Sequence, residues 1–297
     1  MVAQTRPRTL ISEAQLSRGR NRVVYRVILT LVIVVFTLVF IGPLYFLFSD
    51  GLKSTTEAVQ VPPTLVPHHL QPANYATAWS RVGLGRLLVN TLYYAFGALA
   101  FQLVFDVAAA YSLSRLRPAL GNVIFALMLV TLMVPATVLV VPQYVTVASL
   151  PILHMNLIGT PEAIWLPSVA NAFNIFLLKR FFDSIPGELL DAAAIDGASP
   201  LRVLRSVVLP ISRPILGVVS IFALVAAWKD FLWPLLVEGD YNPSRETLNV
   251  GIWEATATSP QNLVLAASAV AAIPTLIFFL IFQRNIMSGL TAGSVKG

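Results

Sequence analysis

The sequence has no cysteine among its 297 residues and only three histidines. A disulfide framework and a thiolate metal site are therefore excluded. His68, His69 and His154 have no carboxylate or third ligand at the spacing of a metal site, so we expect none of them to bind a metal. The motifs of zinc peptidases, of serine hydrolases and of nucleotide-binding P-loops are also missing. We therefore predict no catalytic residue, no bound metal and no cofactor for this chain.

Charged residues are scarce as well. They make up 11% of the chain, against roughly 25% in a soluble domain, while 57% of the residues are hydrophobic. This composition predicts an integral membrane protein. The net charge of +6 is compatible with binding to nucleic acid, but the basic residues mostly flank apolar runs, where orientation in the bilayer explains them. We therefore predict no nucleic-acid partner.

Six apolar runs are long enough to cross a bilayer, which takes roughly 20 residues. They cover about residues 24–49, 86–113, 121–145, 162–182, 214–237 and 263–284. Pro135 and Pro142 interrupt the third run and predict a kink there. No small-residue cleavage site follows the first run, which is therefore predicted to be a retained span rather than a signal peptide. We predict an all-α integral membrane fold with a cytoplasmic N-terminal tail (1–22) and a six-span domain (23–297).

Basic residues are distributed unevenly between the two sides of these predicted spans. Fifteen of the 20 lysines and arginines flank the runs on the side of the N-terminus, four lie on the opposite side, and Lys229 lies at a span end. Cytoplasmic segments of membrane proteins carry an excess of basic residues. We therefore predict that both termini and the segment 184–214 are cytoplasmic.

The polar segment 184–214 lies between two apolar runs and has a helical pattern of its own. Good helix formers over residues 188–195 predict a first short helix, and Gly197 is placed to end it in a left-handed conformation. Ser199 and Pro200 then predict the N-cap and the first position of a second helix. The segment is therefore expected to form a helix-turn-helix.

The second helix of this segment has an amphipathic pattern. Leu201, Leu204 and Val208 are expected to form its apolar face, and Pro210 and Pro214 to end it. Periodicity alone fits either an amphipathic connector on the membrane surface or a docking element for another protein. A DNA-binding helix-turn-helix has the same outline, but spans at both ends keep this segment away from a DNA groove.

The same segment resembles the EAA loop of binding-protein-dependent ABC importers. The resemblance rests on residues 192–198 (Ala-Ala-Ala-Ile-Asp-Gly-Ala), followed at a fixed distance by 207–210 (Val-Val-Leu-Pro). More narrowly, the chain is similar to the carbohydrate-uptake permeases of the maltose type from about residue 30 to the C-terminus. The other matching stretches are 90–92, 110–115, 181–186, 228–234 and 289–297. Asp191 stands where the family usually has glutamate, and Leu204 where an aromatic residue is common.

The resemblance implies a type I importer permease in a bacterial-type cytoplasmic (inner) membrane. Its implied partners are a homologous second permease, two cytoplasmic ATPase subunits that bind the ATP, and an external solute-binding protein. The implied solute is a sugar or oligosaccharide, with a polyol phosphate as the alternative, and the chain either contacts this solute or only gates its path. The implied ATPase-coupling residues are Glu188, Asp191, Ala192, Ala193, Asp196, Gly197, Ala198, Leu204, Leu209 and Pro210.

Polar residues inside the apolar runs are candidates for the solute pathway, because they are costly in a bilayer and usually face protein or water. Asn171 and Asn174 are three residues apart and would share one helix face, where their amides bind either sugar hydroxyls or a neighbouring helix. Gln102 and Gln143 are further candidates, with packing as the alternative for Gln143. Asp106, four residues after Gln102, is expected to pair with a basic partner.

Two other classes of membrane protein remain open from the residues alone. An ion-coupled secondary transporter needs buried acids and broken helices, and Asp106 is its one candidate acid. A membrane-embedded enzyme needs clustered histidine, aspartate or cysteine, which the sequence lacks. Lys229 and Asp230 are expected to belong to an aromatic belt at the outer interface and to form a local ion pair.

Overall fold

The computed structural model describes residues 19–239 and 241–292, and these residues form helices and loops without any strand. The predicted all-α fold is confirmed. Most of the predicted N-terminal tail (1–22) and the end of the matching stretch 289–297 lie outside the described residues.

Three long helices correspond to the first, second and sixth predicted spans. They are α2 (Gly19–Asp50), α5 (Leu84–Tyr111) and α16 (Gln261–Ala292). Each contains a stretch long and apolar enough to cross a membrane. α5 is central, because it packs against both α13 (Arg213–Lys229) and α9 (Ala172–Ser184).

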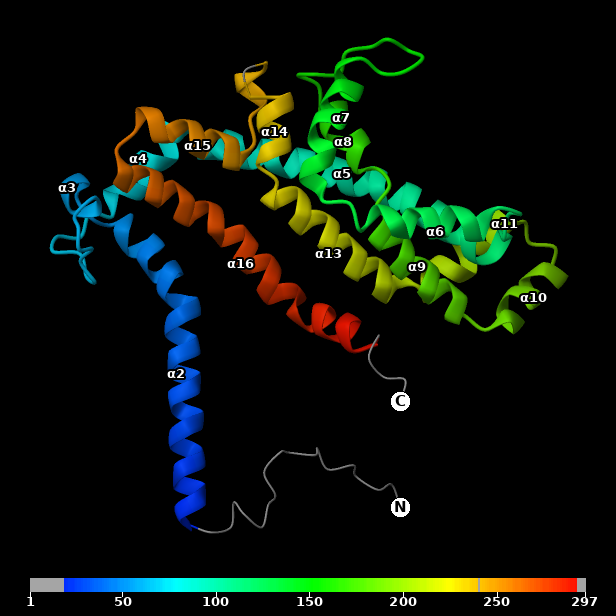
Figure 1. Cartoon of the computed structure of the whole chain (residues 1–297), viewed down its shortest axis with the longest axis horizontal. Coiled ribbons are helices and arrows are strands. Elements are labelled where there is room, and N and C mark those ends of the chain that lie inside the picture. The colour runs from blue at the N-terminus through cyan, green and yellow to red at the C-terminus, as the bar shows by residue number, and fades with distance from the viewer. Residues whose placement is uncertain (1–18, 240, 293–297) are drawn as a thin grey trace.

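α2 differs from the other long helices in its isolation. Residues 21–40 are all exposed, and the helix leaves the rest of the chain at a steep angle (Figure 1). Its C-terminal end packs against α16, where Gly51 lies so close that an added Cβ would be 3.0 Å from the backbone of Ala266. Among the described residues, α2 therefore packs against its own chain through its C-terminal end.

The third, fourth and fifth predicted runs are each divided into shorter helices, and only the break in the third was predicted. The third run divides into α6 (Gly121–Thr131) and α7 (Ala136–Ala148), which meet at 109°. The fourth consists of α8 (Pro161–Trp165), a 3-10 turn η2 (Leu166–Ser168) and α9. The fifth divides into α13 and α14 (Leu232–Val237). By length and composition the described helices supply three straight spans, or up to five when each bent pair is counted as one.

Proline accounts for part of this division. Pro135 is the N-cap of α7 and directly follows the break after α6. The residue before a proline disfavours helical backbone angles, so Pro135 explains why the helix ends there. Pro142 lies inside α7 without ending it, so the prediction that both prolines interrupt the third run is correct only for Pro135. Pro167 likewise lies in the short turn η2, directly before the break that separates α8 from α9.

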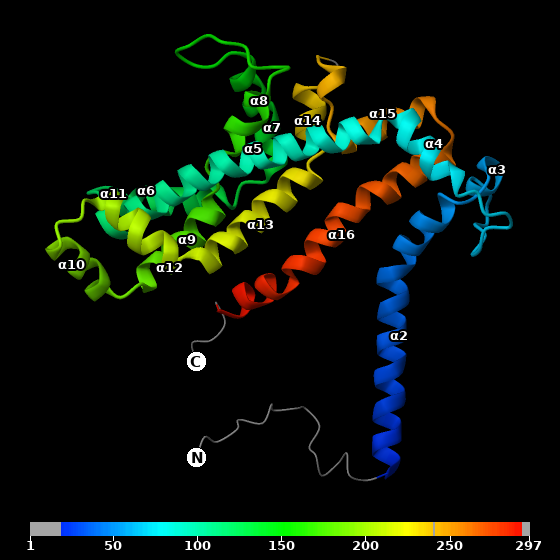
Figure 2. The ribbon, with the colours of Figure 1, turned by 180° about the vertical axis from the view of Figure 1, so that it is seen from behind.

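Short helices complete the fold at the two ends of the long ones. At one end are α3 (Thr55–Ala58), α4 (Ala73–Val82), the 3-10 turn η4 (Pro243–Arg245) and α15 (Leu248–Thr258). At the other end, α5 runs into a π-helical turn η1 (Ser112–Leu116), near α10 (Gly187–Ile195) and α11 (Pro200–Val203). Figure 2 shows α10 and α11 at the opposite end of α5 from α4 and α15.

Buried side chains form three clusters along the molecule. The cluster nearest α10 joins α5, α9, α11 and α13 through residues such as Val107, Leu178, Val203 and Val219. The second joins α4, α5, α15 and α16, and the third joins α5, α7, α8 and α14. In the third, Gly97 of α5 allows a close approach, because a Cβ there would lie 2.3 Å from the ring of Trp165.

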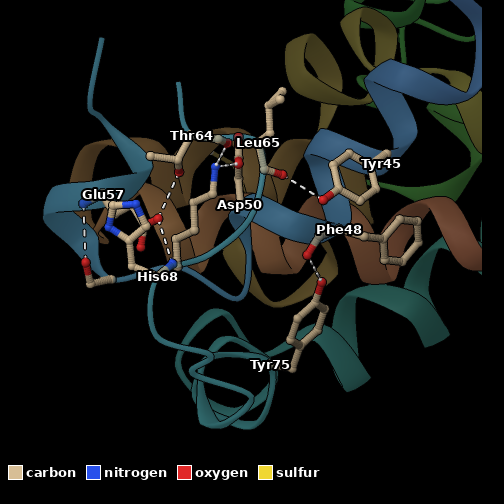
Figure 3. Close-up of polar contacts among 10 residues, drawn as sticks. Tyr45, Phe48, Asp50, Glu57, Thr64, Leu65, His68 and Tyr75 are labelled. Carbon is tan, nitrogen blue, oxygen red and sulfur yellow. Dashed lines mark hydrogen bonds and ion pairs between the residues drawn. The ribbon is translucent and has the colours of Figure 1, made fainter. Parts of the chain in front are cut away.

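A cluster of polar side chains joins the C-terminal end of α2 to the loop that follows it (Figure 3). Lys53 is only 1% exposed; its Nζ pairs with Asp50 at 2.5 Å and donates to the carbonyl oxygen of Thr64 at 2.6 Å. Glu57 accepts hydrogen bonds from the Thr64 hydroxyl at 2.8 Å and from the backbone N–H of His68 at 3.0 Å. We call the residues Asp50, Lys53, Glu57 and Thr64 the outer cluster.

Candidate functional site

The segment 184–214 folds as the sequence predicted for its first half. α10 covers Gly187–Ile195, and Gly197 follows it with φ of +74°, in the left-handed region that favours glycine. Ser199 is the N-cap of α11, with its side chain accepting the N–H of Arg202 at 3.4 Å. The predicted helix, glycine turn and second helix are therefore confirmed.

The apolar face of the second helix differs from the prediction. Leu201 is 72% exposed, whereas Val203 and Val208 are buried in the core between α5, α9 and α13. The cause is a π-helical turn, η3 (Leu204–Val208), which adds a residue to the turn and so brings positions five apart onto one face. Leu204 is half-buried against the same core.

The end of the second helix also differs from the prediction. Helical structure continues past Pro210 through α12 (Leu209–Ile211), and the chain bends by 83° at Ser212 before α13 begins. Pro210 is tolerated because the wide turn before it already departs from α-helical hydrogen bonding. Pro214 lies in the first turn of α13, where a backbone N–H has no partner within the helix, so the missing N–H of proline costs nothing. Pro214 therefore begins a helix instead of ending one.

The predicted coupling residues divide into an exposed set and an anchored set. The exposed ones are Glu188, Asp191, Ala192, Asp196, Gly197 and Pro210. The anchored ones pack partly against the core formed with α5 and α9; they are Ala193, Ala198, Leu204 and Leu209. One side of the segment is thus fixed to the spans, and the other side is free to contact another protein.

Polar contacts attach this segment to the neighbouring spans. The Tyr111 hydroxyl at the end of α5 donates to the carbonyl oxygen of Pro200 at 2.9 Å. The Arg115 guanidinium donates to the carbonyl oxygens of Phe182 and Ile185, the latter at 2.8 Å, and so binds the C-terminus of α9. A cleft of about 360 Å³ lies between η1, α10 and α11, with Tyr111, Arg115 and Asp191 in its wall.

Asp183 adds a second link between η1 and α9. Its carboxylate accepts from the Ser114 hydroxyl at 2.6 Å and pairs with Lys179 at 2.8 Å. Burial acts to raise the pKa of Asp183, but the hydrogen bonds from Lys179 and Ser114 outweigh it, and the pKa lies below its usual value. The carboxylate therefore stays charged at neutral pH and keeps both partners.

Asn171 and Asn174 do not share a face of one continuous helix, because α9 begins between them. Asn171 is the N-cap of α9, and its side chain accepts the backbone N–H of Asn174 at 3.0 Å. Asn171 is exposed, whereas the side chain of Asn174 is only 2% exposed. Of the two predicted pathway candidates, the structure leaves only Asn171 facing open space.

Asp106 has a different partner from the one predicted. It is fully buried, and its Oδ1 accepts the backbone N–H of Asn171 at 2.9 Å. Among the described residues it forms no ion pair. The positive end of the α9 dipole replaces the expected basic side chain, since a helix N-terminus attracts a carboxylate.

Gln102 and Gln143 line two neighbouring cavities. The first, of about 210 Å³, lies between α5, η2 and α13, with Gln102 and Asn171 in its wall. The second, of about 310 Å³, lies between α7, η2 and α14, with Gln143 in its wall. The residues common to both walls are Ile164, Pro167, Ser168 and Asp230. Both glutamines therefore line cavities between the broken helices.

The predicted local ion pair between Lys229 and Asp230 is wrong. In the described part of the chain Lys229 forms no ion pair with Asp230, and Lys229 lines a different cavity, of about 530 Å³, beside α15 and α16. Asp230 lies in the extended gap between α13 and α14, and its Oδ1 accepts the N–H of Trp233 at 3.4 Å. The available signal was an acid four residues before Pro234 at the end of an apolar run, where a helix break is expected.

Broken apolar helices around polar cavities, joined to an exposed helix-turn-helix beyond the spans, define an α-helical membrane transport component. The chain belongs to the family described as "Binding-protein-dependent transport system inner membrane component", whose family model matches residues 102–291. The predicted resemblance to importer permeases and the predicted inner-membrane setting are thereby confirmed.

Two curated relatives match almost the whole chain. The sn-glycerol-3-phosphate transport system permease protein UgpE of Rhizobium meliloti (strain 1021) is 31% identical over 271 residues, covering 88% of this chain and 94% of the relative. The protein of the same name from Agrobacterium fabrum (strain C58 / ATCC 33970) is 30% identical over 281 residues, covering 91% and 97%.

A solved structure matches the fold. It is a chain of a bacterial ABC transporter involved in the import of the acidic polysaccharide alginate, with a TM-score of 0.74 at 21% identity. The match covers 93% of this chain and 99% of that chain. The two chains therefore share the same overall fold.

Proposed function

We propose that this chain is one of two homologous permease subunits of an ATP-driven importer. It forms part of the membrane path for a sugar, an oligosaccharide or a polyol phosphate that an external binding protein delivers. Two cytoplasmic ATPase subunits supply the energy, and both termini of this chain face the cytoplasm. The names of the relatives and of the similar structure support the transport class and the range of solutes.

The observation that carries the proposal is the exposed apolar surface of the segment 184–214. Leu189, Ile195 and Leu201 are 46%, 87% and 72% exposed, and the charged residues around them support a position of this segment outside the bilayer. Exposed apolar side chains rimmed by polar ones mark protein interaction sites. We assign this surface to the ATPase subunit, and we call the segment the coupling segment.

The anchoring of the coupling segment suggests how ATP hydrolysis reaches the spans. Val203 and Val208 are buried against α5, α9 and α13, so a force applied to α10 and α11 acts on all three helices. Close-packed interfaces move as rigid bodies instead of deforming. Closure of the ATPase pair therefore rotates these spans and changes the side from which the cavities are open.

The test is Gly197→Asp, because Gly197 has φ of +74° and nothing within 4 Å of an added Cβ. The side chain strains the left-handed turn by about 1 kcal/mol and adds a second negative charge beside Asp196 at the proposed contact. We expect normal membrane levels, at least a tenfold loss of ATP-driven uptake, and weak retention of the ATPase subunits during purification.

Gly83→Asp is the matched control. Gly83 has nearly the same φ, +73°, and equally open surroundings, but it lies between α4 and α5 at the opposite end of the molecule. Strain alone affects both variants equally, so only Gly197→Asp should release the ATPase. If Gly197→Asp retains the ATPase and transports normally, the coupling segment is a passive connector and the proposal is wrong.

A further inference from the structure

We propose that this chain itself contributes a solute subsite, formed by the two neighbouring cavities around Asp230, and that the subsite accepts an uncharged polyhydroxylated solute and not a phosphate ester. This inference rests on the proposed importer function. It states that this chain contacts the solute instead of only gating its path. It also states that the solute is a neutral sugar or polyol and not a polyol phosphate.

The first argument is the position of two helix breaks. The fourth run is interrupted at residues 169–171 and the fifth at 230–231, and Asn171 and Asp230 both line the smaller cavity. Irregular backbone at membrane depth leaves N–H and C=O groups unpaired, so it is tolerated only inside protein or beside a polar cavity. Two breaks that meet at one cavity are typical of substrate sites in membrane transporters.

The second argument is that buried polar groups in this wall have no partner. Gln102 is 6% exposed, and its side-chain amide makes no hydrogen bond among the described residues. Thr247 is 4% exposed, and its hydroxyl likewise has no partner in the described structure. A buried polar group without a hydrogen bond costs free energy. A ligand that offers both donors and acceptors recovers that cost, as a polyhydroxylated solute does.

The third argument is the charge of the wall. The residues that line the two cavities include Asp230 but no lysine, arginine or histidine. A phosphate monoester carries close to two negative charges and needs cationic or N–H donors to replace its hydration. It would meet the Asp230 carboxylate instead, with no counter-charge in the wall. A sugar or polyol hydroxyl can donate to that same carboxylate.

The size and the apolar part of the wall fit the same class of solute. Volumes of about 210 and 310 Å³ that share part of their lining lie together within the roughly 300–1,000 Å³ of small-molecule sites. Trp233 lines the larger cavity, and its indole N–H is held by the carbonyl oxygen of Ala163 at 2.9 Å. Its fixed ring offers an apolar surface to the C–H face of a sugar.

The experiment uses the assembled importer with its binding protein in proteoliposomes that contain ATP. Labelled maltose, trehalose and sorbitol are compared with labelled sn-glycerol 3-phosphate. We expect ATP-dependent accumulation of at least one neutral solute, with no competition by excess sn-glycerol 3-phosphate. Accumulation of the phosphate ester, or of none of the neutral solutes, overturns the inference. If the binding protein also fails to stimulate ATP hydrolysis, the proposed importer function is wrong as well. This second measurement separates failure of the proposed subsite from failure of the proposed function.

A pair of isosteric variants tests the subsite itself, with uptake of the accepted neutral solute as the readout. Thr247→Val removes the unpartnered hydroxyl of the proposed subsite. Thr275→Val removes a half-buried hydroxyl, which has no hydrogen bond to any described residue, from the cavity beside α15 and α16. We expect Thr247→Val to raise the KM about five- to tenfold at unchanged thermal stability, and Thr275→Val to leave it unchanged. If the KM values of both variants equal that of the wild type, this chain has no subsite at the cavity.

Discussion

The outer cluster and the cavity wall both bury polar side chains, but they differ in how those side chains are satisfied. In the outer cluster, Lys53 has an ion pair and a carbonyl partner, and the Glu57 carboxylate accepts two hydrogen bonds. In the cavity wall, the Thr247 hydroxyl is buried without a hydrogen-bond partner within the described residues, and Gln102 is buried beside the same cavity. The two groups have similar burial, so burial alone does not distinguish them.

The difference shows how structural and functional polar groups can be separated. A fully partnered buried network specifies one arrangement of the chain and is costly to break. A buried group that lacks a partner lowers stability, and it is retained only where something else needs it. The outer cluster therefore fixes the end of α2, and the cavity wall is reserved for a ligand. Four variants or conditions break or sharpen this comparison.

Lys53→Met should have the largest effect on stability. The methionine fills a similar volume, but Asp50 loses its ion-pair partner and the Thr64 carbonyl loses its donor. Removing one member of a buried ion pair costs about 3–5 kcal/mol, and the lower end applies because Asp50 is partly exposed. The measurement is the thermal unfolding midpoint of the purified protein.

The control for this variant is Lys179→Met. Lys179 pairs with Asp183 at 2.8 Å, but Asp183 has a 36% exposed side chain, so the loss should be at most about 1 kcal/mol. Equal shifts for the two variants would show that the outer cluster is no more structural than a surface ion pair.

Asp106→Ala should have the next largest effect. The substitution leaves the N–H of Asn171 without its acceptor at the start of α9, and loss of such a cap costs about 0.5–2 kcal/mol. Asp106→Asn keeps an acceptor oxygen and should restore most of the stability. A stability loss as large in the asparagine variant as in the alanine variant would show that the negative charge, and not the hydrogen bond, matters at this position.

The third effect depends on pH and concerns Glu246, which lies between η4 and α15. Burial first, and then the negative charge of Glu254, raises the pKa of Glu246 to about 7, while Arg86 at 3.8 Å partly opposes the rise. A carboxyl group with a raised pKa stabilises the fold below its unfolded pKa, about 4.3, and that contribution is lost as the pH rises to about 7. The unfolding midpoint should therefore fall between pH 5 and pH 8.

Glu246→Gln is the control for this pH dependence. The amide cannot ionise, so the fall in the unfolding midpoint between pH 5 and pH 8 should become smaller. An unchanged profile would assign the pH dependence to other groups.

Gln102→Leu should have the smallest effect on stability. Its amide has no partner to lose within the described residues, so an apolar side chain of similar volume should leave the unfolding midpoint unchanged or slightly higher. Asn74→Leu is the contrast, because Asn74 donates to the carbonyl oxygens of Gly51 and Lys53 at 3.0 and 2.9 Å. A clear loss in Gln102→Leu would mean that Gln102 is structural, like Asn74.

Much of this fold follows from local sequence patterns. Apolar length predicts α2, α5 and α16, and the order of Gly197, Ser199 and Pro200 predicts the turn of the coupling segment. Each of these features depends on residues within about one helical turn of one another. The apolar runs and the polar segment between them also predict the class of protein, a membrane transport component.

The errors arise where a distant residue decides the local structure. The break before α9 depends on Asp106, which lies 65 residues earlier and binds the N–H of Asn171. The inward turn of Val203 depends on a π-helical turn that periodicity with 3.6 residues does not include. The position of Asp230 depends on packing between α8, α13 and α14. Hydropathy contains no information on any of these contacts.

The isolation of α2 has a consequence for how the chain enters the membrane. Residues 21–40 are all exposed, and all hydrogen bonds of a helix interior are internal, so α2 is stable in lipid as a single helix. The fourth run depends on the rest of the chain, because α8 has only 5 residues and Asp106 of α5 accepts a hydrogen bond at the start of α9. We therefore expect α2 to move from the insertion machinery into the bilayer early and as a single helix. The fourth run should adopt its final position only after α5 is in the bilayer.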